Sequence, residues 1–151
     1  MPTMSSLPTA SPAALSIGTL AKRTGVKVPT IRYYESIGLL PEAPRTGSNR
    51  RSYDDGVVNR LRFIRHAREL GFEVEAIRQL LAMADDPGRP CRDADQLAHT
   101  HLAEIESRIA RLEALRDEVR RMVEGCAQGQ VRSCHVIEVL ADHAHCLHDR
   151  H

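Results

Sequence analysis

The sequence predicts a mainly α-helical protein, with a helix-turn-helix domain in its front half and one long helix in its back half. Two observations carry this prediction. Two short helical segments lie on either side of a turn that contains Gly25, which is typical of a helix-turn-helix. Farther along the chain, apolar residues recur at steps of three, four or five, as in an amphipathic helix; they are Leu97, Leu102, Ile105, Ile109, Leu112, Leu115, Val119 and Met122.

Local capping signals place the first two helices and the segment after them. Ser16 is a candidate N-cap for a short helix, which Gly25 ends because glycine readily takes a left-handed conformation. Pro29 suits the first turn of a second helix, and Gly38 stops that helix. Residues 41–52 carry Pro, Gly, Ser and Asn among arginines, so we expect a loop or a small hairpin there.

Two further helices follow in the front half. The first begins at Asp54 and Asp55, which favour a helix N-terminus, and it stops at Gly71. The second covers residues 73–83 and ends at the helix-breaking run Asp-Asp-Pro-Gly at 85–88. These helices complete the domain that begins with the helix-turn-helix.

Two cysteines bracket the long helical pattern: Cys91 precedes it and Cys126 follows it, with Cys134 shortly after. At about 1.5 Å per residue this helix spans roughly 50 Å, so Cys91 and Cys126 of one chain cannot meet. They can meet when two copies of the helix run antiparallel, which implies a homodimer with two thiol sites built from both chains. The alternative is that each cysteine is a small buried hydrophobic residue.

These patterns divide the chain into four segments. The long helix ends near Glu124, Gly125 and Gly129 open a loop, and residues 136–140 form one further turn. We therefore expect a disordered arm (1–14), a helix-turn-helix domain (15–86), a dimerisation helix (91–124), and a metal-binding loop with a His-rich tail (125–151).

Charge is distributed unevenly along the 151 residues, although the net charge is only +1. Residues 15–68 hold 11 Lys and Arg against 4 Asp and Glu, whereas the rest holds 10 against 16. A basic front half indicates nucleic acid at that end; the alternative is an accidental charge split on a solvated surface. The sequence lacks a membrane span and a secretion signal, so we expect a cytoplasmic protein whose four cysteines are reduced and available as ligands.

The front half carries five distinctive motifs: IGTLAKRTGV at 17–26, TIRYYE at 30–35, GLLP at 38–41, NRRSY at 49–53 and IRHARELGF at 64–72. Together they closely resemble the MerR family of bacterial regulators. The resemblance implies a winged helix-turn-helix DNA-binding domain, a long antiparallel coiled-coil dimerisation helix and a homodimer bound to double-stranded promoter DNA.

The residues expected to contact DNA lie on both short helices and on the wing. A second helix with hydroxyls, a guanidinium and flat rings can enter the major groove and reach bases and phosphates. Arg50 stands where many family members have an aromatic residue. The alternative for each residue is a solvated arginine or a packed tyrosine, and the same choice is open for Arg60, Arg62 and Arg65. The candidate DNA contacts are Lys22, Arg23, Thr30, Arg32, Tyr33, Arg50, Arg51 and Tyr53.

The cysteines resemble the metal-sensing branch of the family, in which Cys91, Cys126 and Cys134 would be the ligands. In that branch, divalent-metal sensors have a cysteine at the Cys91 position and copper(I) sensors have a serine. Three thiolates suit the sites that Zn²⁺, Cd²⁺, Pb²⁺ or Hg²⁺ take, whereas two suffice for Cu⁺. The C-x7-C spacing is closer to that of copper sensors, but Cys91 weighs more because it changes the ligand count.

Histidines suggest a second metal site near the end of the chain. Clustered His and Cys are a compositional signal for metal binding, and His135 could alternatively complete a tetrahedral thiolate site. Each of these side chains could equally be an ordinary solvent-facing residue. The candidates for the second site are His99, His101, His135, His145, Cys146 and His148.

The resemblance also implies a mechanism. Metal binding would shift the two DNA-binding lobes and distort the promoter, so that RNA polymerase, acting indirectly, initiates at metal efflux or detoxification genes. One alternative is a copper(I)-responsive regulator of the same family. Another is a thiol redox sensor in which Cys126 and Cys134 form a disulfide. An enzyme is not expected, because we find no nucleophile–base pair and no glycine-rich phosphate loop.

Overall fold

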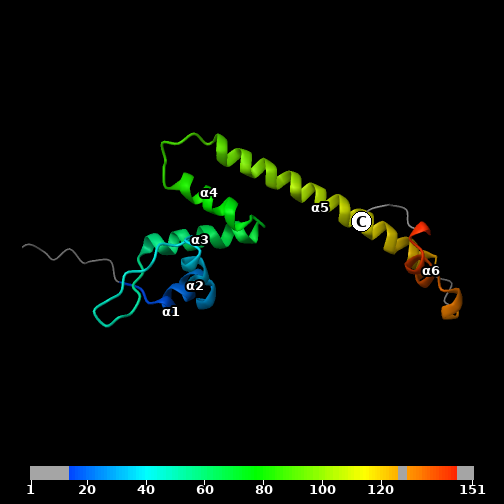
Figure 1. Ribbon diagram of the computed structural model, residues 1–151, viewed down its shortest axis with the longest axis horizontal. Helices are drawn as coiled ribbons and strands as arrows, with labels where there is room; N and C mark the ends of the chain where they lie inside the picture. The colour runs from blue at the N-terminus through cyan, green and yellow to red at the C-terminus, as the bar shows by residue number, and fades with distance from the viewer. Residues whose placement is uncertain (1–13, 126–128, 146–151) are drawn as a thin grey trace, which may run out of the picture. The chain divides into compact units, whose positions relative to one another are not determined.

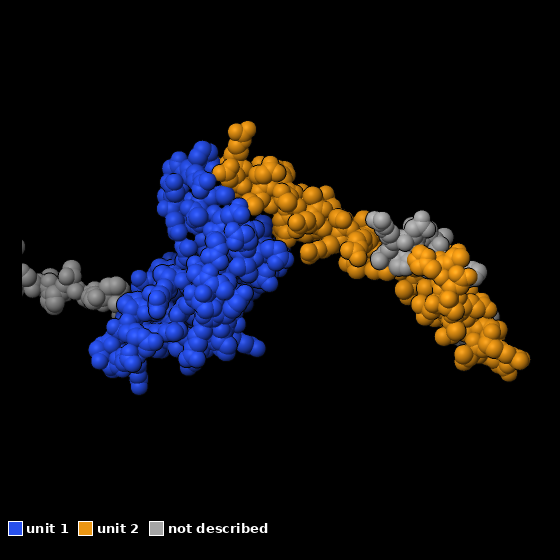
Figure 2. All heavy atoms as spheres, in the orientation of Figure 1, with its two compact units in different colours: residues 1–90 blue, residues 91–151 orange. Residues whose placement is uncertain are grey.

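The computed structural model describes residues 14–125 and 129–145, which fold into helices and short turns (Figure 1). The chain divides into two compact units, residues 1–90 and 91–151 (Figure 2). Within the described ranges the structure has no named strand and only isolated β-bridges. The predicted mainly α fold, a helix-turn-helix domain followed by a long helix, is confirmed.

Helix α1 (Ile17–Thr24) has the caps that the sequence predicts. The Ser16 hydroxyl accepts a hydrogen bond from the Thr19 backbone N–H at 3.2 Å. Gly25 ends the helix in the left-handed region with φ of 70°, and its N–H donates to the Ala21 carbonyl at 2.8 Å. A side chain at Gly25 would also collide with Arg65, because a Cβ there would lie 2.1 Å from Arg65 Nη1.

Helix α2 (Val28–Ser36) begins one residue earlier than predicted and has Pro29 in its first turn. The predicted stop at Gly38 is present, because Gly38 has φ of 74° and directly follows the C-cap residue Ile37. Ile31 is fully buried and Tyr34 is nearly so, which anchors α2 against the rest of the unit. Helices α1 and α2 therefore form the predicted helix-turn-helix pair.

A small hairpin connects α2 to α3. Bridges join Leu15 to Tyr53 and Arg45 to Arg51, both antiparallel. The Leu15 and Tyr53 backbones exchange hydrogen bonds of 2.8 and 2.9 Å. Asn49, near the tip, takes a left-handed conformation with φ of 62°. The segment predicted as a loop or small hairpin thus runs as two short antiparallel arms, and its base is held by Leu15, which lies just before the N-cap of α1.

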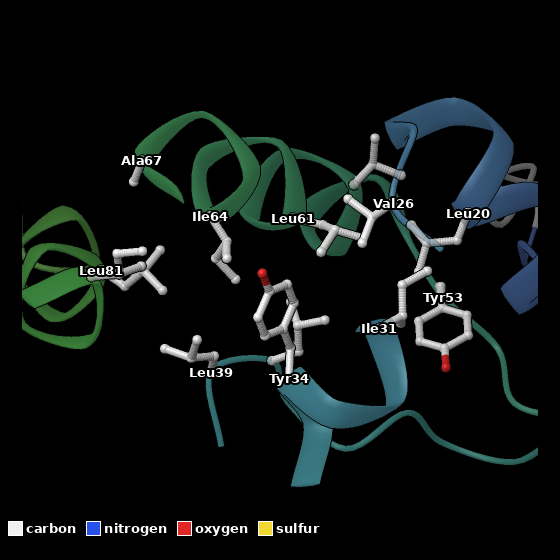
Figure 3. Close-up of a cluster of buried hydrophobic side chains, with 13 residues drawn as sticks. Leu20, Val26, Ile31, Tyr34, Leu39, Tyr53, Leu61, Ile64, Ala67 and Leu81 are labelled. Atoms are coloured by element: carbon white, nitrogen blue, oxygen red, sulfur yellow. The ribbon is translucent and has the colours of Figure 1, made fainter. Parts of the chain in front are cut away.

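Helices α3 (Asp55–Glu69) and α4 (Val74–Ala84) complete the first unit. Asp54 caps α3 by accepting from the Val57 N–H at 2.9 Å, and Gly71 follows α3 with φ of 87°. The aliphatic core lies between α1, α2, α3 and α4, as the sticks in Figure 3 show. Its buried side chains are Leu20, Val26, Ile31, Tyr34, Leu39, Leu40, Tyr53, Val58, Leu61, Ile64, Ala67, Ile77 and Leu81.

The second unit is built on helix α5 (Arg92–Glu124), whose 33 residues confirm the predicted long helix. Helix α6 (His135–Ala141) packs on α5 and buries Val139 and Glu118. Short 3-10 turns precede and follow α6 at Val131–Ser133 and His143–His145. Among the described residues, no helix is long and apolar enough to cross a membrane.

Most of the predicted apolar stripe of α5 remains uncovered in the single chain. Leu112 is 64% exposed, and the described part of the chain packs only α6 against α5 in substantial contact. Burying an exposed aliphatic side chain is worth about 1.5–3 kcal/mol, so such a stripe requires a covering surface. The exposed members of the predicted stripe are Leu102, Ile105, Ile109, Leu112 and Val119, and Val123 of the same helix is exposed as well.

Candidate nucleic-acid interface and thiol site

Four arginines line a hollow of about 540 Å³ in the first unit. Arg32 comes from α2, while Arg45, Arg50 and Arg51 come from the hairpin. The wall is completed by Asn49 and by Ser16 and Ile17, where the positive end of α1 opens. Guanidinium groups and a helix N-terminus together favour an anion such as a phosphate.

One face of α2 points outward with groups that can reach nucleic acid. Arg32 is exposed and Tyr33 is 52% exposed, whereas the flanking Ile31 and Tyr34 are buried. Thr30 is half-buried at the edge of this face. The Tyr33 and Tyr34 rings are tilted, with their centroids 5.8 Å apart. The core thus fixes α2 by Ile31 and Tyr34, which leaves Thr30, Arg32 and Tyr33 available for a ligand.

Arg51 and Tyr53 meet Glu35, whose side chain is only 6% exposed. Arg51 Nη1 donates to Glu35 Oε2 at 2.9 Å, and the Tyr53 hydroxyl donates to Glu35 Oε1. Burial, followed by the hydrogen bond and the charge of Glu35, raises the pKa of Tyr53 to about 12, although Arg51 opposes this shift. The hydroxyl therefore stays protonated at neutral pH and acts as a donor.

Tyr53, one of the expected DNA contacts, is buried in the single chain. Tyr53 is 2% exposed, and Figure 3 shows its ring beside Ile31 with the hydroxyl pointing away from the cluster. Through its bond to Glu35, Tyr53 joins the hairpin to α2 in the single chain. The two residues are 18 positions apart, so spacing along the sequence did not indicate this contact.

The remaining expected contacts are Lys22 and Arg23 of α1 and Arg50 of the hairpin, and they differ in whether the charge is paired. Lys22 and Arg50 are exposed. Arg23 is also exposed, but its Nη1 lies 2.9 Å from Asp55 Oδ1 in an ion pair that is 41% and 69% exposed. An exposed pair of this kind is worth little, so Arg23 can exchange Asp55 for a phosphate at small cost.

Arginines of α3 donate to backbone carbonyls near the ends of the two shorter helices. Arg65 Nη1 donates to the Thr24 carbonyl at 2.7 Å, and Arg62 Nη2 donates to the Arg23 carbonyl at 3.3 Å. Arg60 Nε donates to the Leu39 carbonyl at 2.9 Å. Helix ends leave carbonyls without intrahelical partners, and these guanidinium groups supply donors. The sequence left phosphate contacts and a solvated face open for these arginines. The structure shows them bonded to backbone carbonyls, and we call these three contacts carbonyl clamps.

The thiols that the structure describes lie near opposite ends of α5. Cys91 is exposed at the residue before α5, and Cys134 is half-buried at the residue before α6. His135, the neighbour of Cys134, lies against Gly125 at the C-terminal end of α5, and α5 alone spans about 50 Å. Cys91 and Cys134 of one chain therefore cannot share an ion. Cys126 lies outside the described residues.

The predicted histidines are dispersed along the second unit. His99 Nε2 lies 3.5 Å from Asp95 Oδ2, and His101 Nδ1 lies 3.7 Å from Glu104 Oε2. Among the described side chains, no three potential metal ligands gather at one point. Nothing is placed for the side chain of His145 or for Cys146 and His148, which are the remaining predicted members of a second metal site.

His135 packs closely against the end of α5. A Cβ added to Gly125 would lie 2.4 Å from His135 Cδ2, so only glycine leaves room for the ring. His135 Nδ1 also lies 3.9 Å from Glu138 Oε2, one turn along α6. The His135 ring therefore follows Cys134 directly in the sequence and lies against Gly125, the residue before Cys126. Sulfur and imidazole donors in this segment fit a thiophilic ion.

Comparison with known proteins places both halves of the chain in one group. A family model described as MerR HTH family regulatory protein matches residues 15–84. A second model, described as MerR, DNA binding, matches residues 58–122. The two matches together cover the helix-turn-helix unit and nearly all of α5.

Individual relatives agree with these matches. Heavy metal-dependent transcription regulator 2 of Rhizobium meliloti is 40% identical over 85% of this chain and 87% of its own. The transcription regulator PbrR691 of Ralstonia metallidurans, crystallised with lead(II), has a TM-score of 0.75 and 36% identity over 83% of this chain and 98% of its own. MerR of Bacillus megaterium, crystallised with mercury(II), has a TM-score of 0.62 and 32% identity over 85% and 100%.

Proposed function

Because the chain belongs to the MerR family of transcription regulators, we propose that it is a metal-responsive regulator that binds promoter DNA as a homodimer. The observation that carries this proposal is the helix α5, with an uncovered apolar stripe along it and a thiol near each end. The relatives are named as regulators, and those with metal in their titles bind thiophilic ions. A regulator is therefore preferred to an enzyme.

We infer that DNA lies against the arginine-lined hollow and the outward face of α2. Arg32, Arg50 and Arg51 would hold phosphates in the hollow, and Lys22 and Arg23 would extend the contact along α1. Thr30 and Tyr33 would lie against base edges or the backbone in the major groove. In this proposal the helix-turn-helix domain covers residues 15–86, and the dimerisation helix covers 91–124.

The proposed effector site is shared between two chains. An antiparallel pair of α5 helices would bring Cys91 of one chain to Cys126 and Cys134 of the other, and would cover the apolar stripe at the same time. The bound ion would supply a positive charge that draws these thiolates together. His135 lies beside Cys134 and over Gly125, so it would be the nearest nitrogen donor to this site.

The proposed mechanism uses the shape of DNA as the signal. Ion binding would order the segment between α5 and α6 and shift the two DNA-binding lobes of the dimer. The lobes would then bend and undertwist the promoter, so that RNA polymerase can engage it and transcribe metal efflux or detoxification genes. Such coupling is reciprocal, because DNA that favours the distorted state must also raise the affinity for the ion.

A divalent ion (Zn²⁺, Cd²⁺, Pb²⁺ or Hg²⁺) is proposed ahead of Cu⁺ because Cys91 is present and exposed at the start of α5. The alternative hypothesis of a copper(I)-responsive regulator is favoured only by the C-x7-C spacing. Three thiolates support the trigonal or tetrahedral geometry of the divalent ions, whereas Cu⁺ is satisfied by two.

Metal titration of the reduced, full-length protein distinguishes the divalent-metal hypothesis from the copper(I) hypothesis. We expect Cys91→Ser to weaken binding of the preferred divalent ion more than about a hundredfold, since a direct ligand matters more than its surroundings. Thiolate–metal absorbance reports the binding. Cys134→Ser is the matched control, because both readings require that thiol. If Cys91→Ser binds every divalent ion as wild type does and Cu⁺ binds most tightly, the copper(I) reading is correct.

A further inference from the structure

Glu35 is a buried carboxylate that the DNA-contact residues do not explain. Its side chain is 6% exposed, yet it lies at the end of α2 within the most basic part of the molecule. Both of its oxygens are used: Oε2 accepts from Arg51 and Oε1 accepts from Tyr53. A buried charge is costly unless it is paired and hydrogen-bonded, so this arrangement holds the hairpin firmly to α2.

Arg51 faces two ways. Its Nη1 is bonded to Glu35 at 2.9 Å, while the side chain as a whole is 34% exposed and lines the hollow with Arg32, Arg45 and Arg50. A guanidinium carries five N–H donors in a fixed planar fork. One nitrogen held by a carboxylate therefore restricts where the remaining donors can point, and Arg51 is among the residues that line the hollow.

The position of Arg51 is passed on to the whole hairpin through its backbone. Arg51 bridges to Arg45, and the Ser52 N–H donates to the Pro44 carbonyl at 2.9 Å. Nearer the tip, the Thr46 N–H donates to the Arg50 carbonyl at 2.7 Å. Because Arg45 and Arg50 lie on these two arms, fixing Arg51 on α2 also fixes the other hairpin arginines of the hollow.

We propose that Glu35 is a positioning residue for DNA binding, which holds Arg51 and the hairpin so that the arginine-lined hollow is preorganised for a phosphate. This inference rests on the proposed DNA-binding function. It makes a prediction opposite in sign to simple electrostatics. Removing a negative charge close to DNA should tighten binding by Coulomb attraction, whereas loss of the positioning carboxylate should weaken it.

The test uses Glu35→Gln in the full-length protein and a short fluorescein-labelled DNA duplex of arbitrary sequence. Fluorescence anisotropy is recorded over a range of salt concentrations. We expect an affinity at least about tenfold lower than wild type, as for loss of one charged hydrogen bond. We also expect the slope of log K against log salt to become shallower by about 0.9, the loss of one phosphate contact. A purely structural role would not change this slope.

Glu42→Gln is the matched control, because Glu42 is an exposed carboxylate in the same connection between α2 and α3. It should leave the slope unchanged and should not weaken binding. If wild type fails to bind the duplex, the proposed function is wrong. If wild type binds and Glu35→Gln binds equally or more tightly with an unchanged slope, the positioning role alone is overturned.

Arg51→Lys gives a second arm in case Glu35→Gln folds poorly, which circular dichroism will show. Lysine keeps the charge, but its compact ammonium lacks the planar fork that bonds a carboxylate and a phosphate together. We expect the slope to become shallower by about 0.9 here as well. A wild-type slope in Arg51→Lys would show that the fork is not needed and would overturn the proposal.

Discussion

Tyr53 shows how burial at a single residue makes stability depend on pH. Its pKa is about 12 in the folded protein, because of burial and the neighbouring Glu35, against about 10 for a tyrosine in an unfolded chain. The raised pKa favours the protonated phenol in the folded state. Its contribution to stability is therefore complete below pH 10 and is lost as the pH rises from about 10 to about 12.

We predict that Tyr53→Phe flattens this alkaline dependence. Urea unfolding between pH 9 and pH 12 should show a smaller decrease in the free energy of unfolding than in wild type, by at most roughly 2.7 kcal/mol for a shift of two pKa units. Phenylalanine keeps the buried ring, so packing against Ile31 is preserved. Tyr33→Phe, at a 52% exposed position, is the control and should leave the wild-type curve unchanged. A Tyr53→Phe curve parallel to wild type would contradict the assignment.

Residues whose role depends on near neighbours in the sequence were predicted well, and others were not. Ser16, Gly25 and Asp54 cap helices as expected, because a cap is decided within three or four residues. The carbonyl clamp from Arg65 to Thr24 joins residues 41 positions apart. Tyr53 and Glu35 are 18 positions apart. Such pairs depend on how helices pack, which spacing along the chain does not specify.

At the scale of elements, α5 is defined by its periodicity and by what it leaves uncovered. The apolar positions predicted from sequence are confirmed as a helix of 33 residues, because the 3.6-residue repeat is a local property. Six large apolar residues of α5 are at least 36% exposed in the single chain. We therefore expect a second copy of the chain, whose α5 carries the same stripe, to cover these residues.

We predict that Leu112→Asp converts the dimer into a monomer. Leu112 is 64% exposed in the single chain and lies near the middle of the stripe. Pairing two helices would bury one carboxylate from each chain without a partner, and we expect dimer affinity to decrease at least about a hundredfold. Light scattering coupled to size-exclusion chromatography gives the mass.

The matched control for Leu112→Asp is Ala110→Asp. Ala110 lies on the same helix but off the apolar stripe, so the same charge is added at a solvated position. This variant should remain dimeric. A dimeric Leu112→Asp, or a monomeric Ala110→Asp, would show that the stripe is not the dimer interface.

At the scale of the whole molecule, the proposed thiol site needs both chains, and mixing variants tests this requirement. Cys91→Ser and Cys134→Ser each remove one thiol from every site of their homodimers. In a mixed dimer, one site receives Cys91 from one chain and Cys126 with Cys134 from the other, and is complete. The second site lacks both mutated thiols. We therefore predict that each mixed dimer, formed from two variants that bind weakly alone, binds metal at half the capacity of a wild-type dimer.

The mixed sample is prepared by unfolding and refolding the two reduced variants together, and absorbance of the thiolate–metal complex measures capacity. Random pairing yields about half mixed dimers, so roughly a quarter of the wild-type signal should return. Each variant refolded alone is the control and should bind weakly. If the mixture binds no better than the separate variants, the ligands come from one chain and the antiparallel arrangement is wrong.

The clamps from α3 have a consequence for how DNA specificity can change over evolution or by engineering. Arg60, Arg62 and Arg65 donate to the carbonyls of Leu39, Arg23 and Thr24, and every amino acid supplies a backbone carbonyl. The helix-turn-helix is thus fastened independently of the outward side chains of α2. If Thr30, Arg32 and Tyr33 read the operator as proposed, they can be exchanged for other residues without loosening the scaffold. A new operator could then be selected while the fold and the proposed metal response are inherited unchanged.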